Sequence, residues 1–454
     1  MHLTSAAGLI ALGFEPVLAT QVINILGAVL LVGAVVVGAN MAAPGQENAL
    51  PRAVAITAAL AAEGMAAWIL GGLEAVLAAG LVGAAIACLV PLFRSGWPER
   101  IDLPALAGLF FAMAYLTRPD SVVMNAAAGF AVLGLGAAAL RTRIRQFLVI
   151  GIIPFTVLVL HMAWRLDYYG DYLPNTFFAK VGVDVGTRLA MVPFYFAKSF
   201  AGALPVVPLA FGFLAFALYR RRVDALMLFL AAVILAHVAY VAWSGGDHMP
   251  MGRVLLGTLA PACILLAACL AQLPQVMRLP VAAMVVLALL GSTLLTPKTR
   301  KLDPAAYVGS IVGRYIAETW PPGSLVALHT AGSTPYFAPD NVYIDMLGLN
   351  DRPIAKRENF PVVTEWQMQP GHSKGDGVYV LSRKPDYIIM GTAEGRELGD
   401  PIFLSDYEMA ELSEMTECYE PVFVEIDYQY DPAETVPWIL NPLPFRYYRR
   451  TCPS

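Results

Sequence analysis

The sequence predicts a mainly α-helical fold, with a polytopic membrane domain of about 8 to 10 spans over residues 1–296 and a small soluble α/β domain over residues 297–454. The first reason is composition, because 58% of the 454 residues are hydrophobic and 14% are charged, with a mean hydropathy of +0.62. A soluble domain usually carries about 25% charged residues. The second reason is that the net charge is +4 as far as Thr296 and −8 beyond it. These values exclude a soluble cytosolic enzyme, a lone secreted domain and a nucleic-acid-binding protein.

Ten apolar stretches are long enough, or nearly long enough, to cross a bilayer core of about 30 Å. They cover residues 17–38, 53–70, 72–93, 103–117, 120–140, 145–164, 202–219, 225–243, 254–271 and 279–296. Two of them, 53–70 and 103–117, are short. Each of these two is therefore a candidate half-helix or interfacial segment rather than a full crossing.

Arginines in the short connections predict the orientation, because cytoplasmic loops retain Lys and Arg. They occupy alternate connections, at Arg94, Arg100, Arg141, Arg143, Arg145, Arg220, Arg221, Arg222 and Arg278. We expect the opposite, outer side to receive the segment 71–74, the turn 118–120, the loops 165–200 and 245–253, and the tail after residue 296. The same alternation places the amino terminus outside. One explanation for that less usual arrangement is that the chain lacks an upstream span and its outer loop.

The outer loop between residues 167 and 180 is rich in aromatic side chains. Its tyrosines are best explained as an interfacial belt, since Tyr and Trp favour the membrane surface. Asp171, Asn175 and Lys180 have a different expected role, because Gly170 and Pro174 predict a turn. That turn would place hydrogen-bonding groups just above the hydrocarbon, where the head group of a lipid-linked substrate would lie.

The outer loop 244–253 places three glycines, an acid, a histidine and an arginine between two apolar stretches. Glycines allow backbone amides to approach a ligand closely, and Arg253 can bind a phosphate through its planar set of donors. The alternative is a structural turn, in which Asp247 caps a helix and Arg253 reaches the lipid head groups. The spacing supports both roles equally, and His248 belongs to the same candidate cluster.

A third polar group combines the turn at Arg118 and Asp120 with Glu74. Capping of the following helix is the expected role of Asp120, and a charge network with Asp247 or Asp171 is the alternative. Glu74 follows two glycines at the edge of an apolar stretch, where ionisable groups usually face a cavity or a partner. His161 and His237 lie alone on apolar stretches and are expected to be packed, hydrogen-bonded histidines without metal-ligand spacing.

The tail changes from spans to the pattern of an α/β domain. Residues 324–329 and 386–390 are predicted buried strands, and residues 307–318 a preceding amphipathic helix. It contains no nucleotide-binding glycine motif. Cys418 and Cys452 could form a disulfide in an oxidising compartment, and two free thiols are the equal alternative.

The order of these motifs resembles that of a known family. Residues 116–120 (Leu-Thr-Arg-Pro-Asp), 169–180 and 245–249 (Gly-Gly-Asp-His-Met), followed by 345–351, 371–374 and 383–387 in the tail, are similar to polytopic GT-C glycosyltransferases related to the mycobacterial terminal arabinofuranosyltransferase. The resemblance covers residues 60–390. It implies a hexosyl- or pentosyltransferase that moves a sugar from a polyprenyl-phosphate donor to an envelope glycan or lipid, in contact with membrane lipids and with no nucleic acid.

What the resemblance implies can be assigned to particular residues. A phosphate leaving group needs cations, for which Arg253, Lys180 and Arg118 are candidates. The acceptor hydroxyl needs a carboxylate base, for which Asp247 and Asp171 are candidates, with direct displacement and inversion as the expected mechanism. We expect Asp120, His248, Asn175 and Glu74 to contact substrate. No metal ligands are predicted and no cofactor is expected, although a divalent metal stays open. The expected location is the bacterial cytoplasmic membrane, with the tail outside the cytoplasm.

This chain departs from the family in one respect. GT-C enzymes usually carry an acidic motif in the first outer loop, and the sequence begins at a point that resembles the second span. The protein is thus either such an enzyme with an incomplete amino terminus or a non-catalytic relative. A flippase or transporter of a lipid-linked sugar and an envelope scaffold are competing hypotheses. A transporter would predict inverted repeats and midplane charges.

Overall fold

The computed structural model describes the chain except for residues 95–98, 183, 296–302, 430–438 and 454 and the side chains of Thr187 and Leu295. The described chain forms two compact units, residues 1–172 with 192–297 and residues 173–191 with 298–454. The predicted domain boundary at 296/297 falls outside the described residues. We describe each unit by itself.

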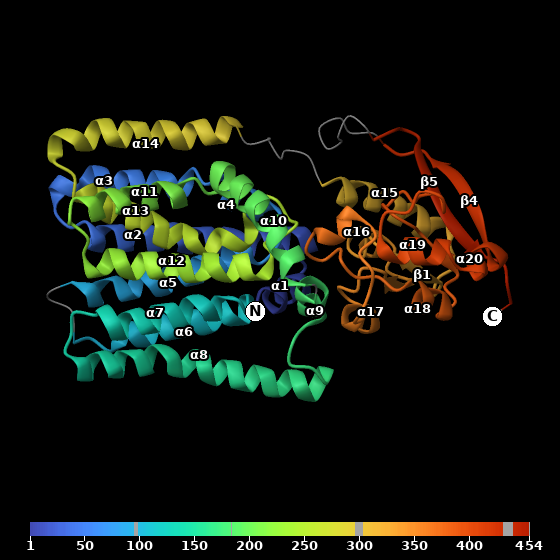
Figure 1. Cartoon of the computed structure of the whole chain (residues 1–454), viewed down its shortest axis with the longest axis horizontal. Helices are drawn as coiled ribbons and strands as arrows, with labels where there is room; N and C mark the ends of the chain where they lie inside the picture. Colours follow the sequence, from blue (N-terminus) through green and yellow to red (C-terminus); the bar gives the residue numbers. More distant parts are fainter. Residues whose placement is uncertain (95–98, 183, 296–302, 430–438, 454) are drawn as a thin grey trace. The chain divides into compact units, whose positions relative to one another are not determined.

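The first unit is a bundle of apolar helices (Figure 1). Its elements are α1 (His2–Ala11), α2 (Pro16–Ala42), η1 (Gln46–Asn48), α3 (Ala49–Leu60), α4 (Glu63–Leu70), α5 (Ala75–Leu89), η2 (Val90–Phe93), α6 (Asp102–Thr117), α7 (Ser121–Leu135), α8 (Leu140–Tyr169), the end of α10 (Val185–Lys198), the π-helical η3 (Ser199–Ala203), α11 (Val206–Tyr219), α12 (Ala225–Ser244), η4 (Arg253–Thr258), α13 (Leu259–Ala271) and α14 (Gln275–Leu295).

The described residues contain seven helices long and apolar enough to cross a membrane. The count is eight if the pair Arg188–Ala203 and Val206–Tyr219, bent by 90°, is one broken span. The predicted short stretch 53–70 is part of a longer helical segment, Gln46–Leu70, whereas Asp102–Thr117 and Ser121–Leu135 are shorter apolar helices. The predicted fold class, a polytopic helical membrane unit with a small α/β unit, is confirmed.

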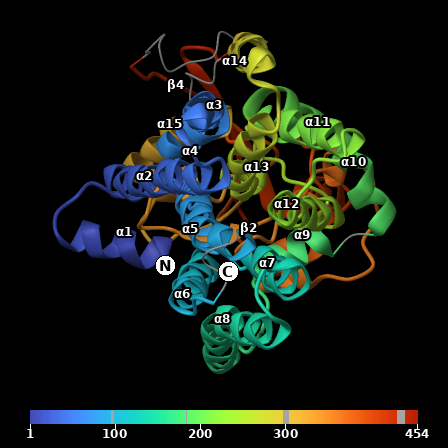
Figure 2. The ribbon, with the colours of Figure 1, turned by 90° about the vertical axis from the view of Figure 1, so that its left-hand side faces the viewer.

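Small residues at helix crossings allow the bundle to pack closely. A Cβ atom on Gly27 of α2 would lie 2.5 Å from the Leu77 Cα of α5, so these two backbones are in direct contact. Helix association in membranes uses such small residues because lipid is as apolar as the helix surface. Helices α5 and α13 are mostly buried, whereas α8 and α14 are mostly exposed and lie at the periphery (Figure 2).

The second unit contains a five-stranded mixed sheet with the strand order β2-β1-β3-β5-β4. Strands β2 and β3 pair parallel with β1, and β5 pairs antiparallel with β3 and β4. Its elements are α9 (Asn175–Val181), the start of α10, α15 (Pro304–Thr319), β1 (Leu325–Leu328), α16 (Ser333–Phe337), β2 (Val342–Asp345), α17 (Arg352–Lys356), η5 (Glu365–Met368), α18 (Gly377–Ser382), β3 (Tyr387–Ile388), α19 (Leu404–Ala410), α20 (Ser413–Cys418), β4 (Tyr419–Ile426) and β5 (Leu443–Arg450).

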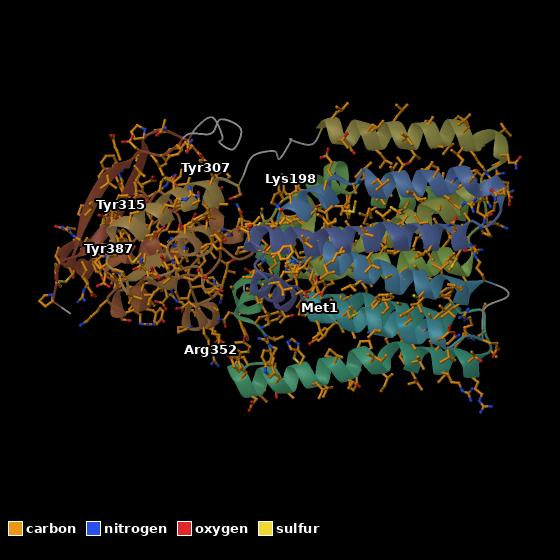
Figure 3. All side chains as sticks on the ribbon, turned by 180° about the vertical axis from the view of Figure 1, so that it is seen from behind. Met1, Lys198, Tyr307, Tyr315, Arg352 and Tyr387 are labelled. Atoms are coloured by element: carbon orange, nitrogen blue, oxygen red, sulfur yellow. A yellow bond between two sulfur atoms is a disulfide. The ribbon has the colours of Figure 1, made fainter. Side chains whose placement is uncertain are left out.

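The predicted helix and both predicted strands of the tail are confirmed as α15, β1 and β3. Aromatic rings pack α15 on the sheet. Trp320 stacks on Tyr387 with ring centroids 3.8 Å apart, and Tyr315 meets Phe445 edge to face at 5.6 Å. Figure 3 labels Tyr315 and Tyr387 among the side chains. Offset and edge-to-face pairs of this kind stabilise cores beyond the area they bury.

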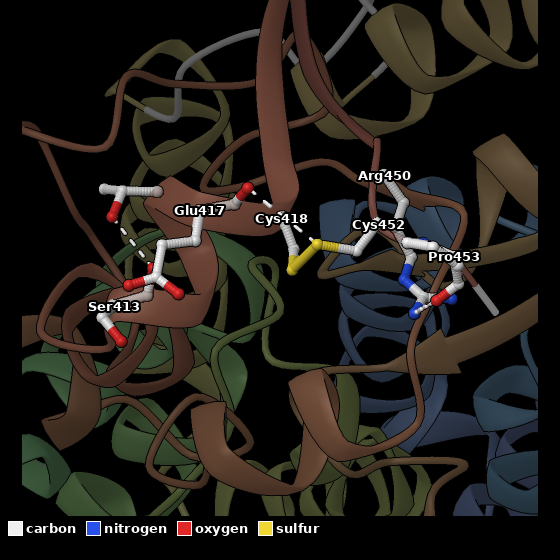
Figure 4. Close-up of a disulfide and its surroundings, with 7 residues drawn as sticks. Ser413, Glu417, Cys418, Arg450, Cys452 and Pro453 are labelled. Atoms are coloured by element: carbon white, nitrogen blue, oxygen red, sulfur yellow. Dashed lines mark hydrogen bonds between the residues drawn. A yellow bond between two sulfur atoms is a disulfide. The ribbon is translucent and has the colours of Figure 1, made fainter.

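Cys418 and Cys452 form a disulfide, which decides between the disulfide and the two free thiols that the sequence left open (Figure 4). The bond joins the end of α20 to the segment after β5, and its Cα atoms are 4.9 Å apart. Arg450 donates a hydrogen bond to the Pro453 carbonyl oxygen (2.7 Å) beside it. The two ends of the β4–β5 hairpin are thus covalently joined.

Candidate functional site

The first charged cluster of the bundle centres on Arg118, at the turn after α6. Its Nη1 donates to Glu74 Oε1 (2.7 Å), and its Nε and Nη2 donate to the two carboxylate oxygens of Asp120 (3.1 and 2.9 Å). Burial disfavours the charged guanidinium, but the carboxylates of Asp120 and Glu74 outweigh it and raise the pKa of Arg118. The side chain is therefore a permanent cation held by two carboxylates.

This geometry corrects the expected role of Asp120. The sequence predicts that its side chain caps the helix that follows, yet α7 has no side-chain capping hydrogen bond at Asp120. Both carboxylate oxygens instead accept from Arg118. A charged bidentate donor forms a stronger hydrogen bond than a neutral backbone N–H, so the ion pair takes the carboxylate.

The second charged cluster lies in the loop between α12 and η4. Arg253 donates through Nε and Nη2 to Asp247 Oδ2, at 2.8 and 2.6 Å, and its guanidinium lies 5.6 Å from the ring centroid of Trp68. His248 Nδ1 is 3.6 Å from Asp247 Oδ1. The Asp247 side chain is only 1% exposed. The loop therefore holds a buried ion pair. Neither predicted role of the loop, phosphate binding or helix capping, includes this pair.

Glycines give this loop its shape. Gly246 has a φ of +81°, in the left-handed region, and a Cβ atom there would lie 3.0 Å from the Tyr195 ring. A side chain at this position would therefore meet both backbone strain and a packed aromatic ring. Gly246 lets the chain turn directly after α12 and brings Asp247 under Arg253.

The two charged clusters line one small cavity. Helices α5, α7 and α12 lie side by side around it (Figures 1 and 2). Its volume is about 20 Å³, and its polar lining consists of Arg118, Asp120, Ser121, His237 and Arg253. This volume holds about one water molecule and no sugar. The structure thus unites residues 118, 120 and 253, which the sequence could only propose to converge.

His237 is the member of this group that sequence reasoning did not assign. As expected, it is buried and hydrogen-bonded, since its Nε2 lies 2.7 Å from the Val254 carbonyl oxygen. It also lines the cavity between the clusters. From the sequence alone, a single histidine on an apolar helix that only packs in the core cannot be distinguished from one that also lines a cavity.

Asp171, Asn175 and Lys180 do not form one cluster within a single unit. Asp171 follows the left-handed Gly170 at the end of α8, in the first unit. Asn175 and Lys180 lie on α9 in the second unit, where a Cβ atom on Gly371 would lie 3.6 Å from Lys180 Cε. The turn predicted to group these side chains is where the chain passes from one unit to the other.

The tail motif around Gly371 contributes a second basic residue to the surroundings of Lys180. Lys374 Nζ donates to the Arg357 carbonyl oxygen (2.6 Å) and lies 4.4 Å from the ring centroid of Phe360. Burial lowers the pKa of Lys374. Arg357 itself is paired with Glu408 at 2.7 Å, so this region is a compensated charge network.

A large apolar cavity, open to the outside of the bundle, also lies between its helices. Its volume is about 850 Å³, and η3, α11 and α14 supply most of its lining, including Phe200, Phe213, Met277 and Val281. The η3 segment connects it with the second charged cluster. A Cβ atom on Gly252 would lie 3.3 Å from Ser199 Cβ, and the next residue, Phe200, lines the cavity. No motif in the sequence indicated this cavity, because residues from separate helices form it.

Among the described residues, no three His, Cys, Asp or Glu side chains gather as a candidate metal site. In sequence comparisons, residues 301–435 match a domain of unknown function (DUF8728), which is less than a third of the chain. No curated protein matches the sequence.

Solved structures show what fold the chain has. ArnT from Cupriavidus metallidurans, solved with undecaprenyl phosphate, is 15% identical with a TM-score of 0.50, and the match covers 75% of this chain and 74% of ArnT. The apo structure of the same protein is 14% identical with a TM-score of 0.50, covering 78% and 77%. The Archaeoglobus fulgidus oligosaccharyltransferase is 14% identical with a TM-score of 0.47, covering 75% of this chain and 52% of its own. The chain thus has a fold similar to that of ArnT.

Proposed function

We propose that this protein is a membrane glycosyltransferase that transfers a sugar from a polyprenyl-phosphate donor to an envelope glycan or lipid, on the outer face of the bacterial cytoplasmic membrane. One observation carries the proposal. Two buried arginines from separate loops, Arg118 and Arg253, line the same cavity, and a large apolar cavity adjoins the loop that holds Arg253. A lipid phosphate needs cations for its phosphate group and an apolar cavity for its hydrocarbon chain.

The apolar cavity would receive the polyprenyl chain. Its volume of about 850 Å³ is in the range of ligand pockets, and its lining is almost entirely apolar. Ser199 and Phe200 of η3 connect it to Gly252, one residue before Arg253. A chain seated there would bring its phosphate towards the charged loop. The structure of ArnT with undecaprenyl phosphate supports the same class of lipid.

The two arginines would stabilise the phosphate leaving group. Charge-assisted, bidentate contacts to phosphate are the strongest hydrogen bonds that a protein offers. Both guanidinium groups are already occupied by carboxylates, and the space between them admits only about one water. Donor binding would therefore require the ion pairs to separate, so that phosphate oxygens replace Asp247 and Asp120 as partners of the arginines.

This exchange suggests how a base becomes available. In the structure Asp247 Oδ2 accepts two hydrogen bonds from Arg253, so Arg253 occupies the oxygen that a base would use. When the donor phosphate binds Arg253, Asp247 would be released to take the proton of the acceptor hydroxyl. The acceptor oxygen then bonds to the anomeric carbon as the sugar–phosphate bond breaks, and polyprenyl phosphate leaves. Asp171 is the second candidate base.

The remaining predicted residues have supporting roles in this proposal. Glu74 and Asp120 would orient Arg118, and His248 lies against Asp247. Lys180 and Asn175 would contact substrate from α9. The disulfide between Cys418 and Cys452 supports an oxidising compartment for the second unit, in agreement with the arginine distribution, which predicts a tail outside the cytoplasm.

The test is sugar transfer by the purified full-length protein in lipid nanodiscs. Polyprenyl phosphates carrying labelled pentoses or hexoses are offered with envelope glycans and lipids as acceptors. We expect labelled acceptor together with free polyprenyl phosphate, and loss of transfer in Arg253→Ala and Arg118→Ala. The matched control is Arg94→Ala, because Arg94 pairs with Asp224 at the opposite end of α12 (3.0 Å).

Two outcomes would contradict the proposal. If the lipid-linked sugar crosses sealed proteoliposomes without sugar transfer, the protein is a flippase. If no polyprenyl phosphate binds to the folded protein in the nanodisc, as judged by native mass spectrometry, the chain is a scaffold of the same fold.

A further inference from the structure

Two residues that line the cavity between the two charged clusters each carry a buried polar atom without a hydrogen-bond partner among the described residues. The atoms are Nδ1 of His237 on α12 and Oγ of Ser121 at the start of α7. His237 is 3% exposed and Ser121 is 5% exposed. A buried polar group without a hydrogen-bond partner destabilises the folded protein. Two of them on residues that line one cavity therefore indicate a bound polar molecule.

The hydrogen bond of the imidazole fixes what this molecule must donate. Nε2 lies 2.7 Å from the Val254 carbonyl oxygen, which can only accept, so Nε2 carries the hydrogen. In the neutral ring Nδ1 is then an acceptor. Its partner must be a hydrogen donor, and the Ser121 hydroxyl can either donate to or accept from the same molecule.

We propose that the cavity holds one ordered water molecule, which donates to His237 Nδ1 and is shared with Ser121 and the Asp120 carboxylate. The volume of about 20 Å³ is enough for one water molecule. Buried waters make about three hydrogen bonds, and these three groups supply that number. The walls from Ala75, Ala78 and Met124 are apolar, so the water is held at the polar end of the cavity.

This water makes His237 a positioning residue for both arginines. Through Nε2 the ring holds the carbonyl of Val254, directly after Arg253. Through the water it holds Asp120, which orients Arg118. One imidazole thus connects two cation clusters whose arginines are 135 positions apart in the sequence. The positioning role rests on the proposed function, whereas the presence of the water does not.

The water itself is tested by a cryo-electron microscopy map of the full-length protein in nanodiscs, at a resolution that shows ordered solvent. We expect one solvent peak within hydrogen-bond distance of His237 Nδ1 and Ser121 Oγ, and its loss in His237→Leu. A dry cavity would overturn the proposal. A direct hydrogen bond between His237 and Ser121 would overturn it as well.

The positioning role is tested by the affinity for an unglycosylated polyprenyl phosphate. His237→Leu removes both hydrogen bonds of the ring, and we expect affinity about tenfold weaker, in line with one or two lost hydrogen bonds near a charge. His237→Gln retains a donor for Val254 and an acceptor for the water, so it should restore most of the affinity. A packing role alone would predict no such rescue.

The matched control is His161→Leu. His161 also lies on an apolar helix, but its Nδ1 is hydrogen-bonded to the Tyr115 hydroxyl (2.8 Å) and it does not line the cavity. Unchanged affinity is expected there. Equal loss in both leucine variants, or none in His237→Leu, would refute the positioning role. A protein that binds no polyprenyl phosphate would refute the proposed function and leave the result of the map standing.

Discussion

The two units bury charge in different ways. In the membrane bundle the buried carboxylates of Asp120 and Asp247 are paired with arginines at hydrogen-bond distance. In the second unit Asp406 faces His329, with 3.7 Å between Oδ1 and Nε2, and both side chains are almost fully buried. Arginine stays charged at any physiological pH, whereas burial lowers the pKa of His329 and favours the neutral ring. The bundle therefore pairs these buried carboxylates with permanent cations, whereas in the second unit the group that faces Asp406 titrates.

The bundle contains its own internal comparison at the two ends of α12. Arg94 and Asp224 at the start are each 31% exposed, and both have structural partners, because Asp224 caps α12 at Met227 and Arg94 donates to the Ala42 carbonyl oxygen. Arg253 and Asp247 at the end are 11% and 1% exposed, and Arg253 lines the cavity. Burying such a pair without a stability benefit is typical of functional charge in membranes.

The largest expected effect is that of Arg253→Ala. Removal of one partner leaves Asp247 as a buried, uncompensated charge, and we expect a loss of about 3–5 kcal/mol in unfolding free energy. Denaturant unfolding of the full-length protein in detergent measures this loss. The double variant Asp247→Leu with Arg253→Met should recover most of the stability but none of the polyprenyl-phosphate affinity. Recovery of both would show that the pair is structural.

Arg118→Ala should have a smaller effect on stability. The Asp120 and Glu74 side chains are 10% and 27% exposed and can be partly hydrated, unlike Asp247 at 1%, so we expect a loss of about 1.5–3 kcal/mol in unfolding free energy. The same unfolding assay applies, with Asp120→Asn as the partner variant. If the two changes act through one contact, the double variant should cost less than the sum of the single variants. Full additivity would place them in separate contacts.

Acid should destabilise the second unit through His329. The folded-state pKa of His329 is lowered by burial, although Asp406 opposes this. As the pH falls below about 6.5, the unfolded chain takes up a proton before the folded one, so stability present above that pH is lost. Hydrogen exchange in β1, corrected for intrinsic rates, should show this loss. Burial raises the pKa of Asp345, which acts in the opposite direction. The control is therefore His329→Gln, which keeps Asp345. In this variant the stability of β1 should depend less on pH.

Arg94→Ala should have the smallest effect. The pair with Asp224 is partly solvated, and such pairs contribute about 1 kcal/mol or less. Asp224 keeps its capping hydrogen bond to Met227 in this variant. We expect polyprenyl-phosphate affinity to be unchanged, as measured by native mass spectrometry. A loss comparable to that of Arg253→Ala would remove the distinction between the two ends of α12.

Prediction of the site from sequence reached the charged residues but not their contacts. Arg118, Asp120, Asp247 and Arg253 were identified because charge is rare in apolar surroundings and costly there. The cap expected at Asp120 was wrong, since a local hydrogen bond competes with an ion pair that only the folded bundle supplies. The role of His237 was incomplete for the same reason.

The sequence by itself determined the fold class and, in the tail, the first helix and two of the five strands, because hydropathy and side-chain period are local properties of the chain. Only the tertiary structure decided that segment 173–191 belongs with the tail, that a broken helix bends by 90°, and that two arginine clusters share a water-sized cavity. These features depend on contacts between residues far apart in the chain, such as Glu74 with Arg118. The packing of helices against one another selects those partners, and no local sequence pattern does.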